Sequence, residues 1–444
     1  MALPVRTVVD VRYAVCVLPD KLEFGQPLTN SGDSSYLKQG LVMKRYCIIG
    51  NGTAGASAAE QIRKRDNNGS IVIFSRETHP YYYRPRLPEY IAGQAELDDF
   101  TLHPLAQYKN WNVDLRFGEN VISIDPAAKE ITGTKSGKIP YDELLLASGS
   151  SCFLPPVKGN DKVGVFTLRT LNDAKALMAA AKKTKTAVLV GGGLLGLEAG
   201  HALINLGLKV EVVELMDRLL PRQLDHESAG LLQGELEKMG FSFHLAAKAQ
   251  EIQGGDAAAG LVLADSTCIE GGIILFSAGV RANLELARQA GLAIDKAVKV
   301  DQFMRTSVPG IWAAGDVAES NGQPCGIWPI AMAQGEAAGA SMAGDLTPYV
   351  PQAPSTTLKV AGIDLISAGN IDAENAGTSK RFVSGSVYRK IVLEGDTIKG
   401  IIFLGSTNGA EECIAAMNQG RHLGSLVNHL DQENFNPPLF LAQD

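Results

Sequence analysis

One stretch of this sequence leaves little choice of fold: residues 186–215 read TAVLVGGGLLGLEAGHALINLGLKVEVVEL. The pattern predicts an apolar strand at residues 187–190, a glycine turn, a helix through Asn205 and a second strand ending at Glu214. Such a turn brings backbone N–H groups and a helix N-terminus up to a pyrophosphate, and a carboxylate about 20 residues further on accepts ribose hydroxyls. Ordinary turn glycines are the alternative, but the complete order of elements favours a dinucleotide site.

The same motif occurs once more, earlier in the chain. Strands are predicted at residues 46–49 and 71–74, with a helix through Ile62 between them and Glu77 close behind. The turn glycines of this copy are Gly50, Gly52 and Gly55. Two copies would bind two nucleotides, or one dinucleotide with a spare unit, and the motifs alone leave this open.

Two further apolar strands support an internal repeat. Residues 141–149 (YDELLLASG) and residues 271–279 (GGIILFSAG) both end in small residues, which let a backbone pass close to a ligand. Each strand follows one glycine motif, so the sequence predicts two copies of one module.

The bulk composition excludes several classes of protein. A chain of 444 residues suggests about three domains. The net charge of −7 comes from mixed acidic and basic residues, which argues against nucleic-acid binding or a polybasic membrane anchor. No apolar run reaches the ~18 residues of a spanning helix. The six cysteines show no metal-ligand spacing and are expected to be reduced thiols of a cytoplasmic protein.

Other segments permit both a functional and a structural interpretation. Residues 79–87 (HPYYYRPRL) predict a loop whose tyrosines and arginines would stack on an anionic cofactor or simply cover the surface. Residues 311–314 predict a strand that delivers Asp316 to the edge where doubly wound sheets bind ligands, although a turn residue is the alternative. The helix from Pro329 is rich in small residues, which would permit close approach to a cofactor.

The remaining segments complete the predicted organisation. Residues 1–42 are expected to be an appendage or an upstream extension of a frame that starts at Met43. The C-terminal strands are predicted at residues 358–368, 386–393 and 398–405, and the helices at residues 411–420 and 422–430. The fold class is α/β, with two Rossmann-like nucleotide-binding domains and a smaller α+β C-terminal domain. Its predicted boundaries are 1–42 for the extension, 43–151 and 270–346 for the first nucleotide domain, 152–269 for the second and 347–444 for the C-terminal domain.

The combined motifs resemble the FAD/NAD(P)H pyridine nucleotide oxidoreductase superfamily. The resemblance rests on both glycine motifs, the ASG and SAG strand ends and residues 306–316, TSVPGIWAAGD. The loop YYYRPRLPEYIAG and the stretch LKVAGIDLISAGNI are similar to its rubredoxin reductase branch, which includes the NADH:rubredoxin oxidoreductases. The resemblance covers the chain from about Met43 onward and implies FAD in the first unit and NADH in the second.

The resemblance also implies which residues contact the cofactors. For FAD they are Gly50, Gly52, Thr53, Ala54, Gly55, Glu77, Arg84, Pro85, Val121, Ala147, Ser148, Gly149, Gly315, Asp316, Trp328 and Gln334. For the nicotinamide nucleotide they are Gly191, Gly193, Leu195, Gly196, Glu198, Glu214 and Gly279. Within these sets, Glu77 would hold the adenosine ribose and Asp316 the ribityl hydroxyls. Arg84 beside the flavin and Glu198 facing the nicotinamide are the implied catalytic residues.

Glu214 favours NADH over NADPH. A 2′-phosphate would lie against its carboxylate, and like charges repel. Arg218 and Arg222 follow closely and would reduce that repulsion, so NADPH stays as the less favoured alternative.

The sequence departs from several members of the superfamily. It contains neither CxxC nor CxxxxC, the thiol pairs that disulfide reductases need for exchange, and no cysteine between Glu77 and Leu97. Glu89 stands where oxygenase-type ferredoxin reductases carry the lysine of RPPLSK. No siroheme or iron–sulfur cysteine cluster is present, so a complete nitrite reductase is not expected.

The predicted function is an FAD-dependent NADH oxidoreductase that passes electrons to a small redox carrier such as rubredoxin, as a monomer or homodimer. Arg84 and Arg86 would help to dock an acidic carrier. The alternatives are an electron-transfer subunit of an assimilatory nitrite or nitrate reductase, an NADH oxidase and, in another class, an NADH-sensing interaction flavoprotein.

Overall fold

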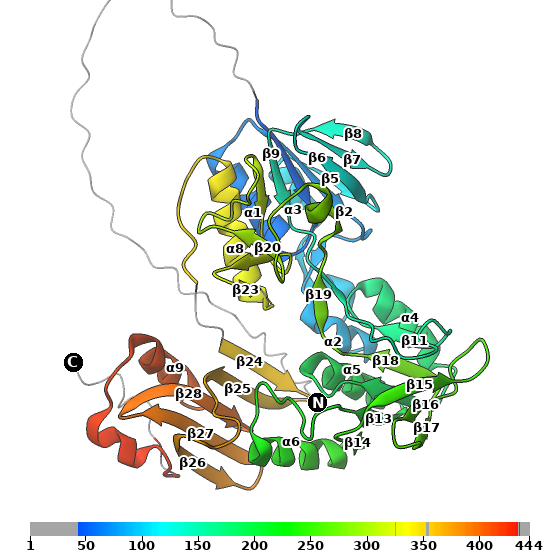
Figure 1. The fold of residues 1–444 in the computed structure, drawn as a ribbon, viewed down its shortest axis with the longest axis vertical. Helices are drawn as coiled ribbons and strands as arrows, with labels where there is room; N and C mark the ends of the chain where they lie inside the picture. The colour runs from blue at the N-terminus through cyan, green and yellow to red at the C-terminus, as the bar shows by residue number, and fades with distance from the viewer. Residues whose placement is uncertain (1–42, 325, 352–354, 434, 436–444) are drawn as a thin grey trace, which may run out of the picture. The chain divides into compact units, whose positions relative to one another are not determined.

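Two parallel five-stranded sheets form the centre of the fold. The computed structural model describes residues 43–324, 326–351, 355–433 and 435, so the predicted extension at residues 1–42 lies outside the described residues. The first sheet has the order β21-β9-β1-β2-β5 (Figure 1). Its strands are β1 (Arg45–Ile49), β2 (Ser70–Ser75), β5 (Val113–Phe117), β9 (Glu143–Leu146) and β21 (Ile311–Ala313).

The second sheet repeats this plan. Its order is β11-β18-β12-β13-β14, and all its strands are parallel. The strands are β11 (Val165–Thr167), β12 (Thr186–Val190), β13 (Lys209–Val213), β14 (Phe241–His244) and β18 (Ile273–Phe276). In each sheet, the strand before the glycine motif is central and pairs on one side with the strand that leads to ASG or SAG. The predicted fold class, with two Rossmann-like units, is confirmed, whereas the exact domain boundaries stay a prediction.

Helices and small sheets surround these units. The longer helices are α1 (Thr53–Arg65), α4 (Leu171–Ala181), α5 (Leu194–Asn205), α6 (His226–Lys238) and α8 (Trp328–Met342), and the shorter ones are α2 (Leu87–Ile91), α3 (Leu105–Asn110) and α7 (Glu285–Gln289). Each unit carries an antiparallel three-stranded sheet: β6 (Val121–Asp125), β7 (Glu130–Gly133) and β8 (Gly137–Pro140) in the first, and β15 (Ala249–Gln253), β16 (Gly260–Leu263) and β17 (Cys268–Glu270) in the second. The remaining short strands are β3 (Tyr81–Tyr82), β4 (Thr101–His103), β10 (Ser150–Cys152), β19 (Val280–Ala282), β20 (Val298–Val300), β22 (Ala318–Ser320) and β23 (Gln323–Pro324).

The C-terminal sheet corrects part of the sequence prediction. Its antiparallel order is β24-β25-β28-β27-β26, from β24 (Ser355–Val360), β25 (Ile363–Gly369), β26 (Thr378–Ser384), β27 (Val387–Glu394) and β28 (Thr397–Leu404), with α9 (Ala410–Gln419) against it. The predicted single strand at 358–368 is wrong. The chain reverses at Ala361 and Gly362, whose φ values are +52° and +87°, as in a two-residue hairpin turn. The predicted helix at 422–430 is a 3-10 turn at Gly424–His429, and β26 was not predicted.

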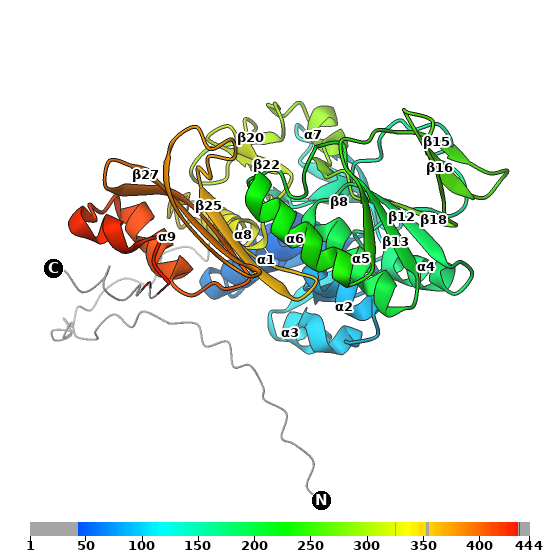
Figure 2. The ribbon, with the colours of Figure 1, turned by 90° about the horizontal axis from the view of Figure 1, so that it is seen from below.

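Small residues of α8 pack this helix against α1. A Cβ added at Gly335 would overlap the Ala54 carbonyl oxygen, and one at Gly339 would overlap that of Ala58. Figure 2 shows the two helices side by side. The predicted purpose of these small residues, an approach to a cofactor, is therefore wrong for both glycines, because they admit a neighbouring helix backbone.

A buried ionic cluster joins the C-terminal sheet to the second nucleotide unit. Asp225 and Lys390 are both fully buried, with their Oδ2 and Nζ atoms 3.3 Å apart. The Tyr388 hydroxyl donates to the same carboxylate at 2.7 Å, and its other oxygen accepts the Ser228 N–H at the start of α6. Burial acts to raise the pKa of Asp225, but these hydrogen bonds outweigh it and lower that pKa. The cluster thus satisfies two buried charges where the sheet meets α6.

The packing of α8 on α1 gives a stability prediction. Gly339→Ala should lower the free energy of unfolding by about 1–3 kcal/mol, because the new methyl group forces two helix backbones apart. Gly234→Ala in α6 is the matched control. Apart from the backbone of its own helix, no atom lies within 4 Å of a Cβ added at Gly234. This change should therefore raise the free energy of unfolding by up to about 1 kcal/mol. Urea unfolding of both variants would measure this. Equal effects of the two changes would contradict the packing argument.

Candidate functional site

The largest cavity with sequence-predicted residues lies at the carboxyl ends of the first sheet. Its volume is about 650 Å³, within the range of small-molecule sites. Twelve residues of the predicted FAD set line it: Gly50, Gly52, Thr53, Ala54, Glu77, Arg84, Val121, Ala147, Ser148, Gly149, Gly315 and Asp316. Apart from Arg84 and Val121, they lie just after β1, β2, β9 and β21, at the edge where open α/β sheets bind ligands.

The glycine turn after β1 shapes this cavity. Gly50 has a φ of +114°, and a Cβ there would overlap the Ala147 carbonyl oxygen. An added Cβ at Gly55 would overlap the Gly50 carbonyl oxygen in the same way. By contrast, no atom lies within 4 Å of the Cβ position of Gly52, which precedes α1. The outer glycines therefore close the turn, and the middle one leaves room for a ligand at the helix N-terminus.

The other predicted FAD residues lie behind the cavity wall. The Gln334 side chain is buried and accepts the Gly315 N–H at 2.9 Å. Trp328 donates through Nε1 to the Tyr81 hydroxyl at 2.7 Å, which in turn donates to Thr53 at 2.9 Å. Pro85 lies in the 3-10 turn Arg84–Arg86. Direct contact of these side chains with FAD stays a prediction, since in the structure they support residues that face the cavity.

Glu77 is engaged within the protein. Its Oε1 lies 2.6 Å from Arg84 Nη2, and its Oε2 accepts the Tyr82 hydroxyl at 2.5 Å. Burial and the nearby Glu77 carboxylate raise the pKa of Tyr82. Arg86 likewise lies 2.6 Å from Glu89. Both arginines proposed to dock an acidic carrier thus have carboxylate partners, which weakens that proposal.

Arg169 is a cavity residue that the sequence analysis missed. Its Nη2 donates to Asp316 Oδ2 at 2.7 Å and to the Ser150 hydroxyl at 2.9 Å, and Ser150 also donates to Asp316 at 2.7 Å. Arg169 stands just before the Thr170 cap of α4, outside both glycine motifs and 147 residues before Asp316. In the sequence, only its position as a basic residue next to the capping box of α4 could have pointed to a role for Arg169.

Two buried donors at this cavity have no partner within the described part of the chain. They are Asn51 Nδ2 and Arg169 Nε, and both residues line the cavity. Buried donors are almost always hydrogen-bonded, so a pair of orphans at one cavity suits a ligand rich in acceptor oxygens. A diphosphate with ribityl and ribose groups meets this requirement.

The second glycine turn has the same geometry as the first. Gly191 has a φ of +115° and approaches the Ser277 carbonyl oxygen, Gly196 approaches Gly191, and Gly193 has open space at its Cβ position. Glu214 is nearly buried and accepts the Gly192 N–H at 2.6 Å and the Met216 N–H at 2.8 Å. The predicted nucleotide acid thus holds the glycine turn in place.

Only part of the predicted nicotinamide set lines a described cavity. Leu195 and Gly279 border a small cavity of about 40 Å³, together with Cys152 and Arg169. Arg169 therefore borders both cavities. Gly191, Gly193, Gly196, Glu198 and Glu214 are not among the lining residues, and their roles stay predictions.

Glu198 contacts the C-terminal sheet. Its Oε1 accepts the N–H of Ala361, at the turn between β24 and β25, at 2.9 Å. Burial raises the pKa of the Glu198 carboxyl, and the nearby Glu89 carboxylate raises it further. This contact was not expected from the sequence, because 163 residues separate the two partners.

Arg218 is likewise engaged. Its Nη2 lies 2.9 Å from Glu374 and its Nη1 3.3 Å from Asp217, and its side chain is only 9% exposed. Arg222 is exposed. Arg218 is therefore poorly placed to offset the charge of Glu214.

The described cysteines contain no redox pair. Cys47, Cys152, Cys268 and Cys413 are all free thiols. Burial raises the pKa of Cys47 and Cys413 to about 12, so neither is a ready thiolate nucleophile. Within the described residues, no group of His, Cys, Asp and Glu side chains could hold a metal ion.

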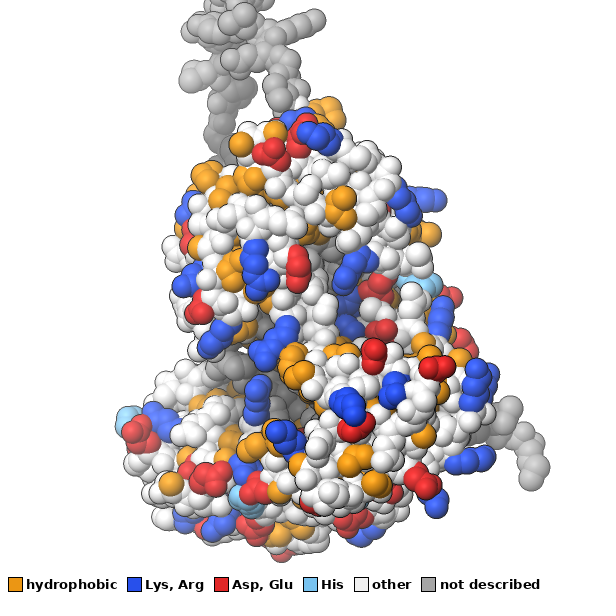
Figure 3. Space-filling model, turned by 45° about the vertical axis from the view of Figure 1, so that its right-hand side comes forward, with side chains coloured by type: hydrophobic (Ala, Val, Ile, Leu, Met, Phe, Trp, Pro, Cys, Tyr) orange, Lys and Arg blue, Asp and Glu red, His pale blue; other side chains and the backbone are white. Residues whose placement is uncertain are grey.

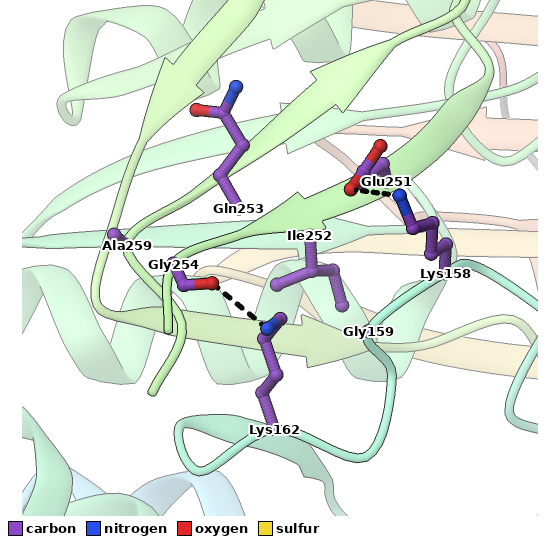
Figure 4. Close-up of a pocket in the computed structure, with 8 residues that line it drawn as sticks. All are labelled: Lys158, Gly159, Lys162, Glu251, Ile252, Gln253, Gly254 and Ala259. Atoms are coloured by element: carbon purple, nitrogen blue, oxygen red, sulfur yellow. Dashed lines mark hydrogen bonds and ion pairs between the residues drawn. The ribbon is translucent and has the colours of Figure 1, made fainter. Parts of the chain in front are cut away.

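A further depression, of about 610 Å³, is lined by residues outside both glycine turns. Figure 4 shows Lys158 paired with Glu251 at 2.8 Å and Lys162 donating to the Gly254 carbonyl at 2.9 Å. Both lysines are engaged within the protein, and no buried donor or acceptor there lacks a partner among the described residues. Nothing in this depression indicates a ligand.

The surface and helices bear on two broader expectations. On the face shown in Figure 3, Lys and Arg side chains are interspersed with Asp and Glu side chains, without a broad area of one sign. In the part of the chain that the structure describes, no helix is both long and apolar enough to cross a membrane.

Comparison with known proteins agrees with this geometry. The model of the pyridine nucleotide-disulphide oxidoreductase family matches residues 44–335, and that of the rubredoxin NAD+ reductase C-terminal domain matches residues 354–421. The chain is 37% identical over 369 residues to the nitrite reductase [NAD(P)H] of Bacillus subtilis, covering 82% of this chain and 46% of that protein. It is 35% identical over 401 residues to the assimilatory nitrate reductase electron transfer subunit of the same organism, covering 89% and 52%. The chain thus spans about half the length of these two relatives.

A third relative matches over most of its own length. The NADH-rubredoxin oxidoreductase of Clostridium acetobutylicum is 33% identical over 348 residues, which cover 78% of this chain and 87% of that protein. A crystal structure of this enzyme superposes with a TM-score of 0.74, covering 86% of this chain and 97% of the other at 28% identity. The resemblance inferred from the sequence is confirmed.

The contact of Glu198 gives a prediction with a defined pH dependence. Because the folded-state pKa of this carboxyl is raised, the folded protein binds its proton more tightly than the unfolded chain, and stability is lost as the pH rises through that pKa. Glu198→Gln keeps an acceptor for Ala361 and removes the charge. Its melting temperature should exceed that of the wild type at pH 8, and the difference should shrink toward pH 5.

Glu198→Ala is the matched control. It leaves the buried Ala361 N–H without its acceptor, so it should destabilise by about 1–3 kcal/mol at every pH. Thermal unfolding monitored by circular dichroism at both pH values measures both variants. A Gln variant that is less stable than the wild type at pH 8 would contradict this account.

Proposed function

The chain belongs to the pyridine nucleotide-disulphide oxidoreductase family, and we propose that it oxidises NADH with FAD bound in the main cavity and passes the electrons to a small redox carrier protein. The observation that carries this proposal is the repeated glycine turn. Two turns of one geometry, each with an open middle glycine, offer two sites for nucleotide phosphates in one chain. One nucleotide is then the resident cofactor and the other the reductant.

The residues of the main cavity fit FAD. The open space at Gly52 and the start of α1 would receive the pyrophosphate. The orphan donors of Asn51 and Arg169 would find phosphate or ribityl oxygens as acceptors. Asp316 uses only Oδ2 for Ser150 and Arg169 among the described residues, which leaves Oδ1 to accept a ribityl hydroxyl.

The protein's own part in the reaction is positioning and the exclusion of water. When bound, FAD supplies an acceptor for hydride that can release electrons one at a time. The Gln334–Gly315 and Trp328–Tyr81–Thr53 hydrogen bonds hold the cavity wall in place before any ligand arrives. Such preorganisation lowers the cost of aligning two cofactors.

The cysteines indicate that electrons leave the flavin without passing through a redox-active thiol pair. The described cysteines are unpaired, and the sequence has no CxxC or CxxxxC. We therefore propose that electrons leave directly from the cofactor to the carrier, with rubredoxin as the first candidate because of the similarity to NADH-rubredoxin oxidoreductase. A cytoplasmic location, in keeping with free thiols, and a monomeric or homodimeric state are part of this proposal.

A second candidate function is the electron-transfer part of an assimilatory nitrite or nitrate reductase. The similarity to two Bacillus subtilis proteins of these types, over about half of their length, favours it. The flavin chemistry would be the same, and only the acceptor would differ.

The proposal is tested by an anaerobic titration. NADH added to the purified protein should bleach the visible absorbance of bound flavin, and oxidised rubredoxin should restore it within seconds. Recovery with a nitrite or nitrate reductase partner but not with rubredoxin would favour the second candidate. Purified protein that neither contains FAD nor binds it would sink the assignment of the main cavity.

The choice of nicotinamide nucleotide gives a separate prediction. The wild type should use NADH with a kcat/KM at least about tenfold above that for NADPH, since a 2′-phosphate would meet Glu214 while Arg218 stays with Glu374. Glu214→Ala should reduce this preference about tenfold. Glu211→Ala, on β13 three residues before Glu214 and paired with His244, is the control and should leave the preference unchanged. Steady-state kinetics with NADH and NADPH measure this preference. Equal kcat/KM values of the wild type for the two nucleotides would count against the proposal.

A further inference from the structure

We propose that Arg76 binds the adenosine half of FAD, and that Glu77, the residue expected to do so, positions Arg84 instead. This inference rests on the proposed binding of FAD in the main cavity. It concerns the end of that cavity formed by Arg76 and Glu77, just after β2, and by residues 119–122.

The carboxylates at this end are already engaged. Both oxygens of Glu77 have partners, Arg84 on one side and the Tyr82 hydroxyl on the other. Glu119 is buried, and its Oε1 accepts the Ser136 N–H and hydroxyl as well as the Lys135 N–H. Both Glu77 oxygens and the Glu119 Oε1 thus already accept hydrogen bonds from the protein.

Arg76 differs from its neighbours. It lines the same cavity and is exposed, and no hydrogen bond, ion pair or ring contact with it is found among the described residues. Arg84, Arg86 and Arg169, in contrast, all bond carboxylates. Arg76 is therefore the arginine of this cavity that no described residue engages, so its whole guanidinium is available to a ligand.

The chemistry of a guanidinium matches adenosine. Its five donors reach the acceptor nitrogens of adenine and the oxygens of ribose. Its flat face can stack on the purine ring, a contact worth about 0.5–2 kcal/mol. The place directly after β2 is where an α/β nucleotide unit receives the ribose. Directly after β2, this chain offers the hydrogen-bond donors of the Arg76 guanidinium. We therefore assign the recognition of adenosine to Arg76.

The test compares FAD with FMN, which keeps the flavin, the ribityl chain and a phosphate but lacks adenosine. The full-length apoprotein is titrated with each cofactor, and the dissociation constant is read from flavin fluorescence. Arg76→Ala should raise the dissociation constant for FAD about tenfold and change that for FMN less than about twofold. Arg76→Lys keeps the charge without the planar fork and should recover only part of the loss.

Two further variants make the result specific. Arg222→Ala removes an exposed arginine of the other nucleotide unit and should leave both constants unchanged. Glu77→Gln weakens the hold on Arg84, which the family resemblance places beside the flavin common to both cofactors, and should therefore affect FAD and FMN alike. A Glu77→Gln variant that loses FAD affinity selectively, beside an unaffected Arg76→Ala, would return the ribose to Glu77 and overturn the inference.

Failure of the inference is distinguishable from failure of the proposed function. If the wild-type apoprotein binds FAD tightly and Arg76→Ala binds it equally well, only the role of Arg76 is refuted. If the wild-type protein binds neither FAD nor FMN, the assignment of the cavity itself fails.

Discussion

The structure depends on one close approach made twice: a glycine after the central strand lies against the carbonyl oxygen of the neighbouring strand. Gly50 meets Ala147 in the first unit, and Gly191 meets Ser277 in the second, each with a φ near +115°. A side chain at either position would overlap that carbonyl, and an L-residue would be strained there. The approach points the following helix N-terminus at open space. The open space at Gly52 and Gly193 is the basis for the two proposed nucleotide sites.

The two units share residues as well as a plan. Arg169 comes from the segment before the second motif, yet it bonds Asp316 at the end of the first sheet. The short strands β10 and β19 pair next to it, so the chain crosses between the units at this point. The C-terminal sheet is tied to the second unit by Asp225, Tyr388 and Lys390. A cofactor in the main cavity would therefore touch residues that depend on more than one unit.

The sequence predicted the features that depend on local order and missed those that depend on long-range contact. The strands beside the glycine turns, the turns themselves and twelve of the thirty residues that line the main cavity were predictable, because strand, turn and helix follow one another within about 30 residues of chain. The hairpin at Ala361 was missed because the apolar pattern continues through its turn. Arg169 and the partners of Glu198 and Arg218 were not predictable, since each meets residues more than 140 positions away. Sequence spacing carries no information on such pairs.

Two equivalent acids have different neighbours at the two predicted nucleotide sites. Glu77 and Glu214 both follow the second strand of a βαβ unit. Glu77 is paired with Arg84, and Arg76, its neighbour in the chain, has no partner among the described residues. Among the described residues, Glu214 accepts the Gly192 and Met216 N–H groups, and Arg218, four residues further along the chain, is held by Glu374. If both sites bind nucleotides, Arg76 offers the first an unengaged cation suited to an electron-rich purine and its ribose oxygens, and Glu214 keeps a negative charge at the second that disfavours a 2′-phosphate. In this proposal, one motif acquires two specificities from the side chains that surround its acid.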